Sequence, residues 1–299
     1  MSIARDGNRL DVHRPRWYRI PQSRPRNCKD CRGTPPVLFA GQPTAATAWK
    51  FGMDDTTHLI VVPAYNEAGA LLPTLERLDR LPTQFEILVV DDGSTDETGA
   101  IAECFASASR LRSHVVRLTG NHGIGIAVQT GYQFALAEGR YHYVIQFDGD
   151  GQHEADCIED LIRNCRERQL DLCIGSRFLG VGDYRSTFWR RVGIRFLSML
   201  ISSLGVTRIT DPTSGFRCAS PAAWQAFAKR YPEDYPEPES LYWCLRNRLQ
   251  VAEIPVHMHS RQAGVSSIGR WRSVYYMCKV TLAILVDVLR TREQPQYGT

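Results

Sequence analysis

From residue 59 onwards, short and almost uninterrupted apolar runs alternate with longer segments of helical character. Strands are predicted at 59–62, 86–90, 114–118, 143–147 and 172–174, and helices at about 67–80, 96–109, 125–137 and 154–168. Strands that are apolar on both faces are typical of a parallel sheet covered by helices on both sides. The pattern therefore predicts an α/β fold that binds its ligands at the carboxyl ends of the strands.

Polar residues gather at three of these strand ends, in the segments 63–67, 91–96 and 148–152. In the third segment, Asp148 and Asp150 directly follow an apolar strand with one glycine between them. Two carboxylates at this spacing can converge on a hard cation such as Mg²⁺ or Mn²⁺, and nearby oxygen donors can complete the ligand set. The alternative is a simple turn, because Asp-Gly pairs are common in turns.

Two glycine-containing segments allow more than one interpretation. After the second strand, the polar residues 94–97 can be explained as caps of the following helix. Capping does not explain the carboxylate of Asp92 at the strand end, where a nucleotide base or ribose could be bound. The segment 121–128 resembles a dinucleotide-binding fingerprint only superficially, because Val128 replaces its third glycine. Its glycines instead favour a close backbone approach at the start of a helix.

Charged residues in the second half of the chain supply further candidates. Arg177 follows the fifth predicted strand, where a guanidinium can neutralise a diphosphate, although a solvated arginine is the simpler interpretation. The segment 211–217 reads as a turn-rich connector with a polar lining. Glu237 and Glu239 open a helix, so they are either capping residues or candidates for a general base.

The charge of the chain is divided unevenly. Residues 1–50 hold ten Lys or Arg against three Asp or Glu, a net charge of +7, and the remaining residues hold 26 against 29, a net charge of −3. The body therefore lacks the basic excess that would predict nucleic-acid binding. The Arg- and Pro-rich residues 1–52 are predicted to be a disordered leader, and Met53 is a candidate for the true start. Nine scattered cysteines, many of them in apolar runs, indicate reduced thiols in a cytosolic protein.

No signal peptide and no uncharged membrane-spanning stretch can be identified; the longest apolar run, 274–289, contains Lys279 and Asp287. Two segments, 188–201 and 270–292, combine apolar bulk, aromatic rings and basic residues. Helices of this composition can lie in an anionic membrane surface, and ordinary core packing is the alternative.

Taken in order, eight segments resemble the motifs of the family 2 glycosyltransferases with the GT-A fold: 63–67, 91–98, 121–127, 148–152, 175–178, 211–217, 236–239 and 261–267. The resemblance covers about residues 57–290, and eight motifs in the right order are highly specific. Within that family the chain looks most similar to the branch that transfers a sugar to polyprenyl phosphate, as dolichol-phosphate-mannose synthases do. The expected fold is a GT-A, Rossmann-like and mostly parallel sheet with helices on both faces, plus a C-terminal amphipathic helix.

The resemblance also implies roles for individual residues. Those implied to bind the nucleotide sugar are Pro63, Tyr65, Glu67, Val90, Asp92, Asp148, Gly149, Asp150, Arg177 and Arg261, with Tyr65 against the base. Asp148, Asp150 and Gln152 would hold Mg²⁺ or Mn²⁺, and Asp148, Asp150, Arg177 and Glu239 would be catalytic. Ser267 stands where many relatives have lysine, which weakens the case for an acceptor-phosphate site in the loop around Arg261.

The implied function is metal-dependent, inverting transfer of a sugar from a UDP-, GDP- or dTDP-sugar to polyprenyl phosphate, for cell-surface glycan synthesis. The alternatives are transfer to a glycan hydroxyl, a catalytically silent nucleotide-sugar-binding subunit, and a nucleotidyltransferase. We expect a leader at 1–52, a catalytic domain at 53–268 and an amphipathic tail at 269–299. A peripheral position at the cytosolic membrane face, with a small integral-membrane partner, is consistent with a lipid acceptor and no spanning helix.

Overall fold

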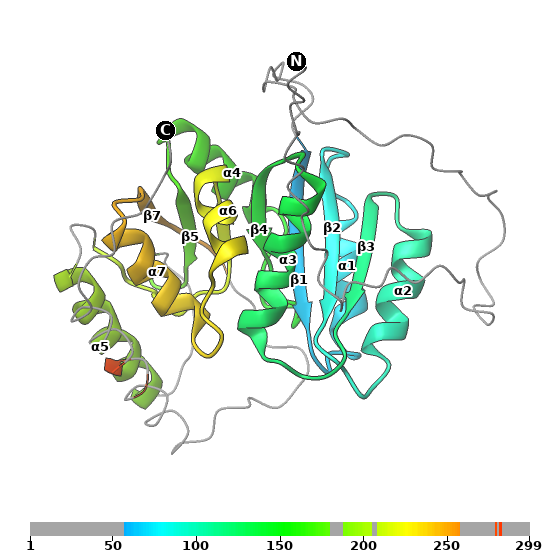
Figure 1. Ribbon diagram of the computed structural model, residues 1–299, viewed down its shortest axis with the longest axis horizontal. Coiled ribbons are helices and arrows are strands. Elements are labelled where there is room, and N and C mark those ends of the chain that lie inside the picture. The colour runs from blue at the N-terminus through cyan, green and yellow to red at the C-terminus, as the bar shows by residue number, and fades with distance from the viewer. Residues whose placement is uncertain (1–56, 180–187, 205–207, 258–278, 280, 283–299) are drawn as a thin grey trace, which may run out of the picture.

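The computed structural model describes residues 57–179, 188–204, 208–257, 279 and 281–282. Within them, seven strands form one sheet with the order β3-β2-β1-β4-β6-β5-β7 (Figure 1). The strands are β1 (Thr57–Ala64), β2 (Phe85–Asp91), β3 (Arg112–Arg117), β4 (Tyr141–Gln146), β5 (Leu172–Ser176), β6 (Arg217–Ala219) and β7 (Val251–Pro255). The helices are α1 (Leu71–Leu78), α2 (Thr98–Ala108), α3 (Ile124–Glu138), α4 (Cys157–Glu167), α5 (Phe188–Leu204), α6 (Pro221–Lys229) and α7 (Pro236–Arg246).

The sheet is mostly parallel, as the sequence predicts. β1 lies between β2 and β4 and is parallel to both, and β2 is parallel to β3. The exception is the three-residue strand β6, which is antiparallel to both of its neighbours, β4 and β5. A strand this short leaves almost no periodic signal, so the sequence pattern does not reveal it.

The sheet is the middle layer of three. Along β1, Leu59 and Val61 point into one core while Ile60 and Val62 point into the other. The first core contains side chains from α3, α5, α6 and α7, and the second contains side chains from α1, α2 and α4 (Figure 1). Burial of both strand faces explains why the strands read as continuous apolar runs.

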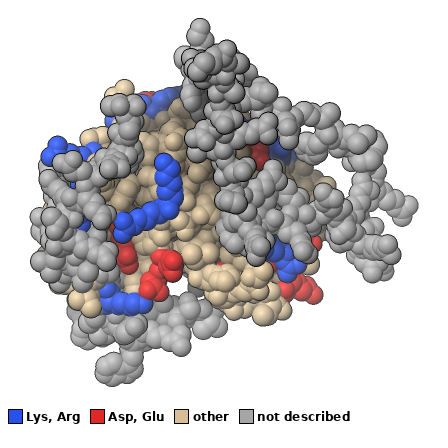
Figure 2. Space-filling view, in the orientation of Figure 1, with Lys and Arg blue, Asp and Glu red and all other residues tan. Residues whose placement is uncertain are grey.

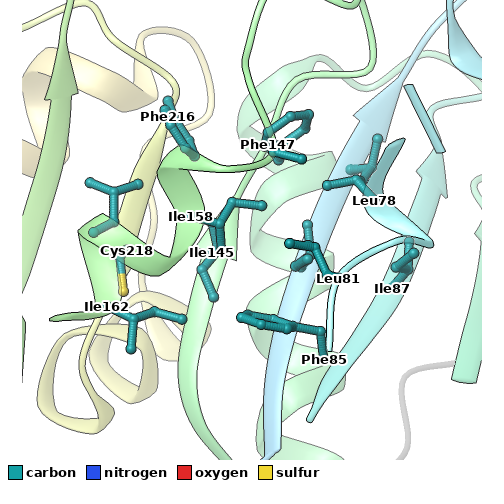
Figure 3. Packing of buried hydrophobic residues seen from close by; sticks show 14 of the residues in the cluster. Leu78, Leu81, Phe85, Ile87, Ile145, Phe147, Ile158, Ile162, Phe216 and Cys218 are labelled. Carbon is teal, nitrogen blue, oxygen red and sulfur yellow. The ribbon is translucent and has the colours of Figure 1, made fainter. Parts of the chain in front are cut away.

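The second core is built from several parts of the chain. Residues of α1, β2, β4 and α4 meet the segment around β6 there (Figure 3). The rings of Phe147 and Phe216 pack edge to face with their centroids 5.5 Å apart. Phe147 follows β4 and Phe216 precedes β6, so this contact fixes the carboxyl end of β4 beside the turn that enters β6.

Three helices begin later than the sequence suggests. α1 starts at Leu71 rather than near 67, α2 starts at Thr98 rather than at Asp96, and α4 starts at Cys157 rather than at 154. The backbone N–H of Glu67 donates to Thr98 Oγ1 (2.9 Å), and that of Ala68 donates to Asp96 Oδ2 (3.3 Å). These bonds satisfy the N–H groups of residues 67 and 68 outside a helix, so the segment before α1 remains a loop.

Several sequence predictions fall partly or wholly outside the described residues. The leader, Arg261 and Ser267 lie outside them, as does the amphipathic tail apart from 279, 281 and 282. The amphipathic segment 188–201 is helical, as part of α5. None of the described helices has the length and apolar character needed to cross a membrane. The six cysteines of the described part are all free thiols.

The face seen in Figure 2 carries charges of both signs. Lys and Arg side chains lie close to Asp and Glu side chains on a largely uncharged surface, and no extended basic stripe crosses its described part. This face agrees with the charge balance of the sequence.

The buried His58 makes the fold sensitive to acid. Its ring is 5% exposed and packs against Phe85 and Tyr143, with both centroid distances 5.5 Å. Burial, reinforced by His142 and Arg166, lowers the pKa of His58 from 6.5 to about 4. The unfolded chain therefore binds this proton at a higher pH than the folded chain, and stability falls as the pH drops from about 6.5 to about 4.

We predict that His58→Phe removes about 2 kcal/mol of the stability loss between pH 7 and pH 5, because the proton-binding difference at this position disappears. Urea denaturation at the two pH values measures the effect. His257→Phe, at an exposed position, serves as the control and should retain the wild-type pH dependence. Equal acid sensitivity of His58→Phe and wild type would refute the assignment.

Candidate active site

The predicted site residues lie at the carboxyl ends of β1, β2, β4 and β5 and in the first turn of α7. Pro63 on β1 and Val90 on β2 are register partners, so the first two polar clusters start side by side. From β1 the chain proceeds to β2 and β3 on one side, whereas β4 lies on the other. Such a switch in strand order is where open α/β sheets bind ligands.

The loops after β1 and β2 are linked through Asn66. Its backbone N–H donates to Ser94 Oγ (3.0 Å), and its side-chain oxygen accepts from the backbone N–H of Thr95 (2.9 Å). Asn66 adopts a left-handed backbone with φ of 53°, which asparagine tolerates better than most residues. Ser94 and Thr95, expected as helix caps, thus hold the β1 loop and leave the Tyr65 ring 42% exposed.

Asp92 anchors the loop before α3. Its two carboxylate oxygens accept the backbone N–H groups of His122 and Gly123, each at 2.8 Å. Burial raises the pKa of Asp92, while these two hydrogen bonds oppose the rise. Gly93 has φ of +68°, and a Cβ added there would lie 2.3 Å from the carbonyl carbon of Gly120. The β2 loop is therefore packed backbone to backbone against Gly120. Within 121–128, the close approach predicted for the glycines occurs at Gly125, where an added Cβ would lie 2.3 Å from the carbonyl oxygen of Pro232, and does not occur at Gly123.

Asp148 contacts a histidine ring that is packed among other aromatic rings. His153 Nε2 is 3.1 Å from Asp148 Oδ2, and the Asp148 side chain is 30% exposed. The His153 ring packs against Phe147 and Phe216, with centroid distances of 5.4 and 4.9 Å. The ring that contacts Asp148 is thus itself held by two phenylalanines, which Figure 3 shows at one end of the apolar cluster.

The rest of this loop folds back on itself. Asp150 is 6% exposed, and its Oδ1 accepts the backbone N–H of Gln152 at 3.1 Å. Thr74 Oγ1 of α1 lies 3.5 Å from the carbonyl oxygen of Gly149, at the limit of a hydrogen bond. Asp148, Gly149 and Asp150 are thus held between α1 and the end of β4.

The oxygen ligands of residues 148–152, called the Asp148 corner here, suit a hard cation. Carboxylate oxygens of Asp148 and Asp150 and the amide oxygen of Gln152 are ligands that Mg²⁺ and Mn²⁺ accept. In the part of the chain that the structure describes, no three His, Cys, Asp or Glu side chains form a metal-binding group by themselves.

The turn that enters β6 lies against Asp148. A Cβ added at Gly215 would lie 2.9 and 3.0 Å from the two carboxylate oxygens of Asp148 and 3.1 Å from Gln146 Nε2. Any side chain at position 215 would push the Asp148 carboxylate away, so only glycine is compatible with the observed position of Asp148. The sequence marks 211–217 as a turn but contains no signal for this contact, because the antiparallel strand β6 creates it.

Arg177 is held by Asp211 from the same turn. Arg177 Nε donates to Asp211 Oδ2 (2.6 Å) and Nη2 donates to Oδ1 (2.7 Å), and the side chains are only 6% and 0% exposed. Nη2 also donates to Thr213 Oγ1 at 2.8 Å. Glu253 of β7 accepts the backbone N–H groups of Thr210 and Asp211, each at 2.7 Å. The guanidinium therefore reaches the site already paired with a carboxylate.

The first turn of α7 brings Glu237 into electrostatic reach of Asp148. Burial raises the pKa of Glu237, the positive charge of Arg217 opposes the rise, and the negative charge of Asp148 adds to it. Glu239 is half-buried in the same turn, and its backbone N–H donates to Tyr235 O at 3.3 Å. The structure thus distinguishes the two glutamates, which the sequence leaves equivalent.

A family model confirms the class of protein that this fold and site define. The model described as glycosyl transferase family 2 matches residues 59–222. The chain therefore belongs to the family 2 glycosyltransferases and is a glycosyltransferase.

Individual relatives agree with the assignment. Polyprenol monophosphomannose synthase of Mycolicibacterium smegmatis is 33% identical over 71% of this chain and 80% of its own length. UDP-N-acetylglucosamine–dolichyl-phosphate N-acetylglucosaminyltransferase of Methanococcus voltae is 28% identical over 68% and 86%. Glucosyl-3-phosphoglycerate synthase of Mycobacterium tuberculosis, crystallised with Mn²⁺, UDP-glucose and phosphoglyceric acid, superposes with a TM-score of 0.57 at 19% identity over 78% of this chain and 79% of that chain. The fold is GT-A, as the motifs predict.

We predict that Asp211→Asn destabilises the protein by about 3 kcal/mol, because it leaves the buried Arg177 guanidinium without its counter-charge. Asp160→Asn provides the matched control, since it breaks an Arg–Asp pair whose side chains are 54% and 49% exposed. That control should cost less than about 1 kcal/mol. Chemical denaturation of both variants measures the difference, and similar losses would contradict the buried pairing.

Proposed function

We propose that this protein is a metal-dependent, inverting glycosyltransferase that moves a sugar from a nucleotide-sugar donor to polyprenyl phosphate, for cell-surface glycan synthesis. The main support is the Asp148/Asp150 corner at the switch point of a family 2 glycosyltransferase fold. The names of two relatives, which act on polyprenol and dolichyl phosphate, support the acceptor class. Those names specify different sugars, so the donor is proposed only as a UDP-, GDP- or dTDP-sugar.

The nucleotide part of the donor would bind across the ends of β1 and β2. Tyr65, with its exposed ring, would stack against the base, and Pro63 and Val90 would form the apolar floor beneath it. Asp92 would contact base or ribose from a carboxylate whose position the α3 loop already fixes, and Glu67 would border the same site. Fixed loops lower the entropy cost of ordering the donor.

The diphosphate would bind at the end of β4, where Asp148, Asp150 and Gln152 would hold Mg²⁺ or Mn²⁺. When bound, the metal would act as a Lewis acid that stabilises negative charge on the departing nucleoside diphosphate. Asp148 is kept in place by His153 on one side and Gly215 on the other, so its carboxylate needs little rearrangement. Arg177 and Arg261 would face phosphate groups and orient them.

A phosphate acceptor is already an anion, so it requires positioning more than deprotonation. Direct attack from the face opposite the leaving group inverts the anomeric centre. Under this proposal neither Glu237 nor Glu239 needs to remove a proton.

The second candidate function is transfer to a hydroxyl of a growing polysaccharide. Proximity of Glu237 to Asp148 favours it, because a hydroxyl acceptor requires a general base near the reacting sugar. Glu239 in the same helical turn is the other candidate for that base. A lipid-extractable product that mild acid cleaves distinguishes the phosphate acceptor from the hydroxyl acceptor.

We predict that Asp148→Ala and Asp150→Ala each lower Mn²⁺-dependent sugar transfer at least about 100-fold, because the diphosphate loses its cation. Radiolabelled transfer from UDP-, GDP- and dTDP-sugars to undecaprenyl phosphate measures the loss. Asp156→Ala, an exposed aspartate close by, should keep wild-type activity.

Undiminished transfer by both corner variants would overturn the proposed site. Donor hydrolysis in the wild type would exclude a catalytically silent subunit, and release of pyrophosphate would identify a nucleotidyltransferase instead. Nuclear magnetic resonance of the product should show inverted configuration at the anomeric carbon, and retention would refute direct displacement.

The helix α5 supplies a surface for peripheral membrane contact at the cytosolic face. Phe196 and Met199 are 44% and 66% exposed, and Arg195 beside them is exposed as well. Leu282, outside α5, is also 61% exposed. Exposed apolar side chains next to a cation are typical of helices that enter an anionic lipid surface. A small integral-membrane partner would strengthen this attachment.

We predict that the double variant Phe196→Ser/Met199→Ser binds anionic liposomes about thirtyfold more weakly, because roughly 2 kcal/mol of apolar burial in the lipid is lost. Deleting residues 270–299 should also lower the association while leaving donor binding intact. Leu136→Ser, which removes a 44% exposed apolar side chain from α3, is the control and should sediment like wild type. Unchanged sedimentation of both test proteins would exclude this surface.

A further inference from the structure

Arg217 is a fully buried cation beside the Asp148 corner. It is the largest of the fully buried side chains and is only 1% exposed. On β6 it is the register partner of Gln146 on β4 and of Ile174 on β5, so it lies in the middle of the sheet. A charge at such a position is costly unless its hydrogen-bonding groups are satisfied, and it therefore requires an explanation.

The guanidinium connects two separate segments. Nε donates to Ser214 O at 2.7 Å and Nη2 donates to Pro212 O at 3.2 Å, both in the turn that enters β6. Nη1 donates to Ser240 Oγ of α7 at 2.9 Å, and that hydroxyl in turn donates to the carbonyl oxygen of Pro236. One side chain therefore fastens the 211–217 turn to the first turn of α7.

This turn makes both of the charged contacts described above. Its Gly215 lies against the Asp148 carboxylate, and its Asp211 binds Arg177. Movement of the turn by a few tenths of an ångström would change both contacts together, since each is already at hydrogen-bond or van der Waals distance. The positions of Asp148 and Arg177 therefore both depend on the 211–217 turn.

We propose that Arg217 is a positioning residue that holds the 211–217 turn, and through it sets the places of Asp148 and Arg177. The proposal rests on the proposed function only for the roles of those two groups. The planar fork of arginine suits this task, because it directs several N–H groups at carbonyl and hydroxyl oxygens simultaneously. Lysine carries the same charge but cannot reproduce that fork.

The first test uses Arg217→Met and Arg217→Lys. We expect Mn²⁺ affinity, measured on the protein without donor by electron paramagnetic resonance of free Mn²⁺, to fall about tenfold in Arg217→Met and less in Arg217→Lys. The variants are compared as folded protein, with circular dichroism and thermal melting as checks. A lower melting temperature with unchanged Mn²⁺ affinity would show a purely structural role and overturn the proposal.

The second test needs neither metal nor activity. Because His153 Nε2 is 3.1 Å from Asp148 Oδ2, the imidazole resonances of His153 report where that carboxylate lies. They can be assigned with His153→Gln, and Asp148→Asn defines the shift that follows from loss of the contact. Arg217→Met should shift these resonances in the direction of Asp148→Asn, and wild-type resonances would overturn the proposal.

Should Arg217→Met fail to fold, Ser240→Ala replaces it. This variant removes the partner of Nη1, and we expect it to shift the His153 resonances and to weaken Mn²⁺ binding a few-fold. Ser220→Ala is the matched control, because Ser220 is a similarly buried serine that bonds to Asp171 instead. Identical behaviour of the two serine variants would overturn the proposal. The resonance test is independent of sugar transfer, so a protein that shifts as expected but transfers no sugar would refute only the proposed function.

Discussion

The structure depends on burial of both faces of a sheet whose central strand, β1, has parallel partners on either side. Helices cover both faces, so most side chains along the strands are apolar and buried, with exceptions such as His58 and Arg217. Polar groups can reach a ligand chiefly where the strands end. Because the parallel strands all end at the same edge, residues far apart in sequence are brought together there without any specific long-range attraction.

The charged groups at this edge are held in place before any substrate arrives. Asp92 accepts two backbone N–H groups, Asp148 lies on the ring of His153, and Arg177 is paired with Asp211. Each bond limits the directions in which a side chain can move. A site built in this way loses little entropy on binding, and its charges need little reorganisation as the leaving group departs.

The sequence correctly predicts strands β1 to β5 and the position of Asp148 and Asp150 after a strand, because burial and periodicity are local properties of the chain; it misses β6 and β7. It also identifies the family, since the spacing of polar residues at strand ends is itself local. It does not reveal that Gly215 touches Asp148 or that Asp211 binds Arg177. Those contacts require β6 to lie between β4 and β5, and a three-residue antiparallel strand has no periodic signature. The start of α1 differs for a related reason, because side chains distant in sequence accept hydrogen bonds from the N–H groups of residues 67 and 68.

The reversed direction of β6 has a consequence for the segment that precedes it. A parallel strand of this sheet places its C-terminal end at the edge where the site lies. Because β6 runs in the opposite direction, it places its N-terminal end there. The segment that connects β5 to β6, called the excursion here, therefore begins beside the site at Arg177 and ends beside it at Gly215. The length of that excursion can therefore vary without moving either endpoint, provided that Asp211 still pairs with Arg177.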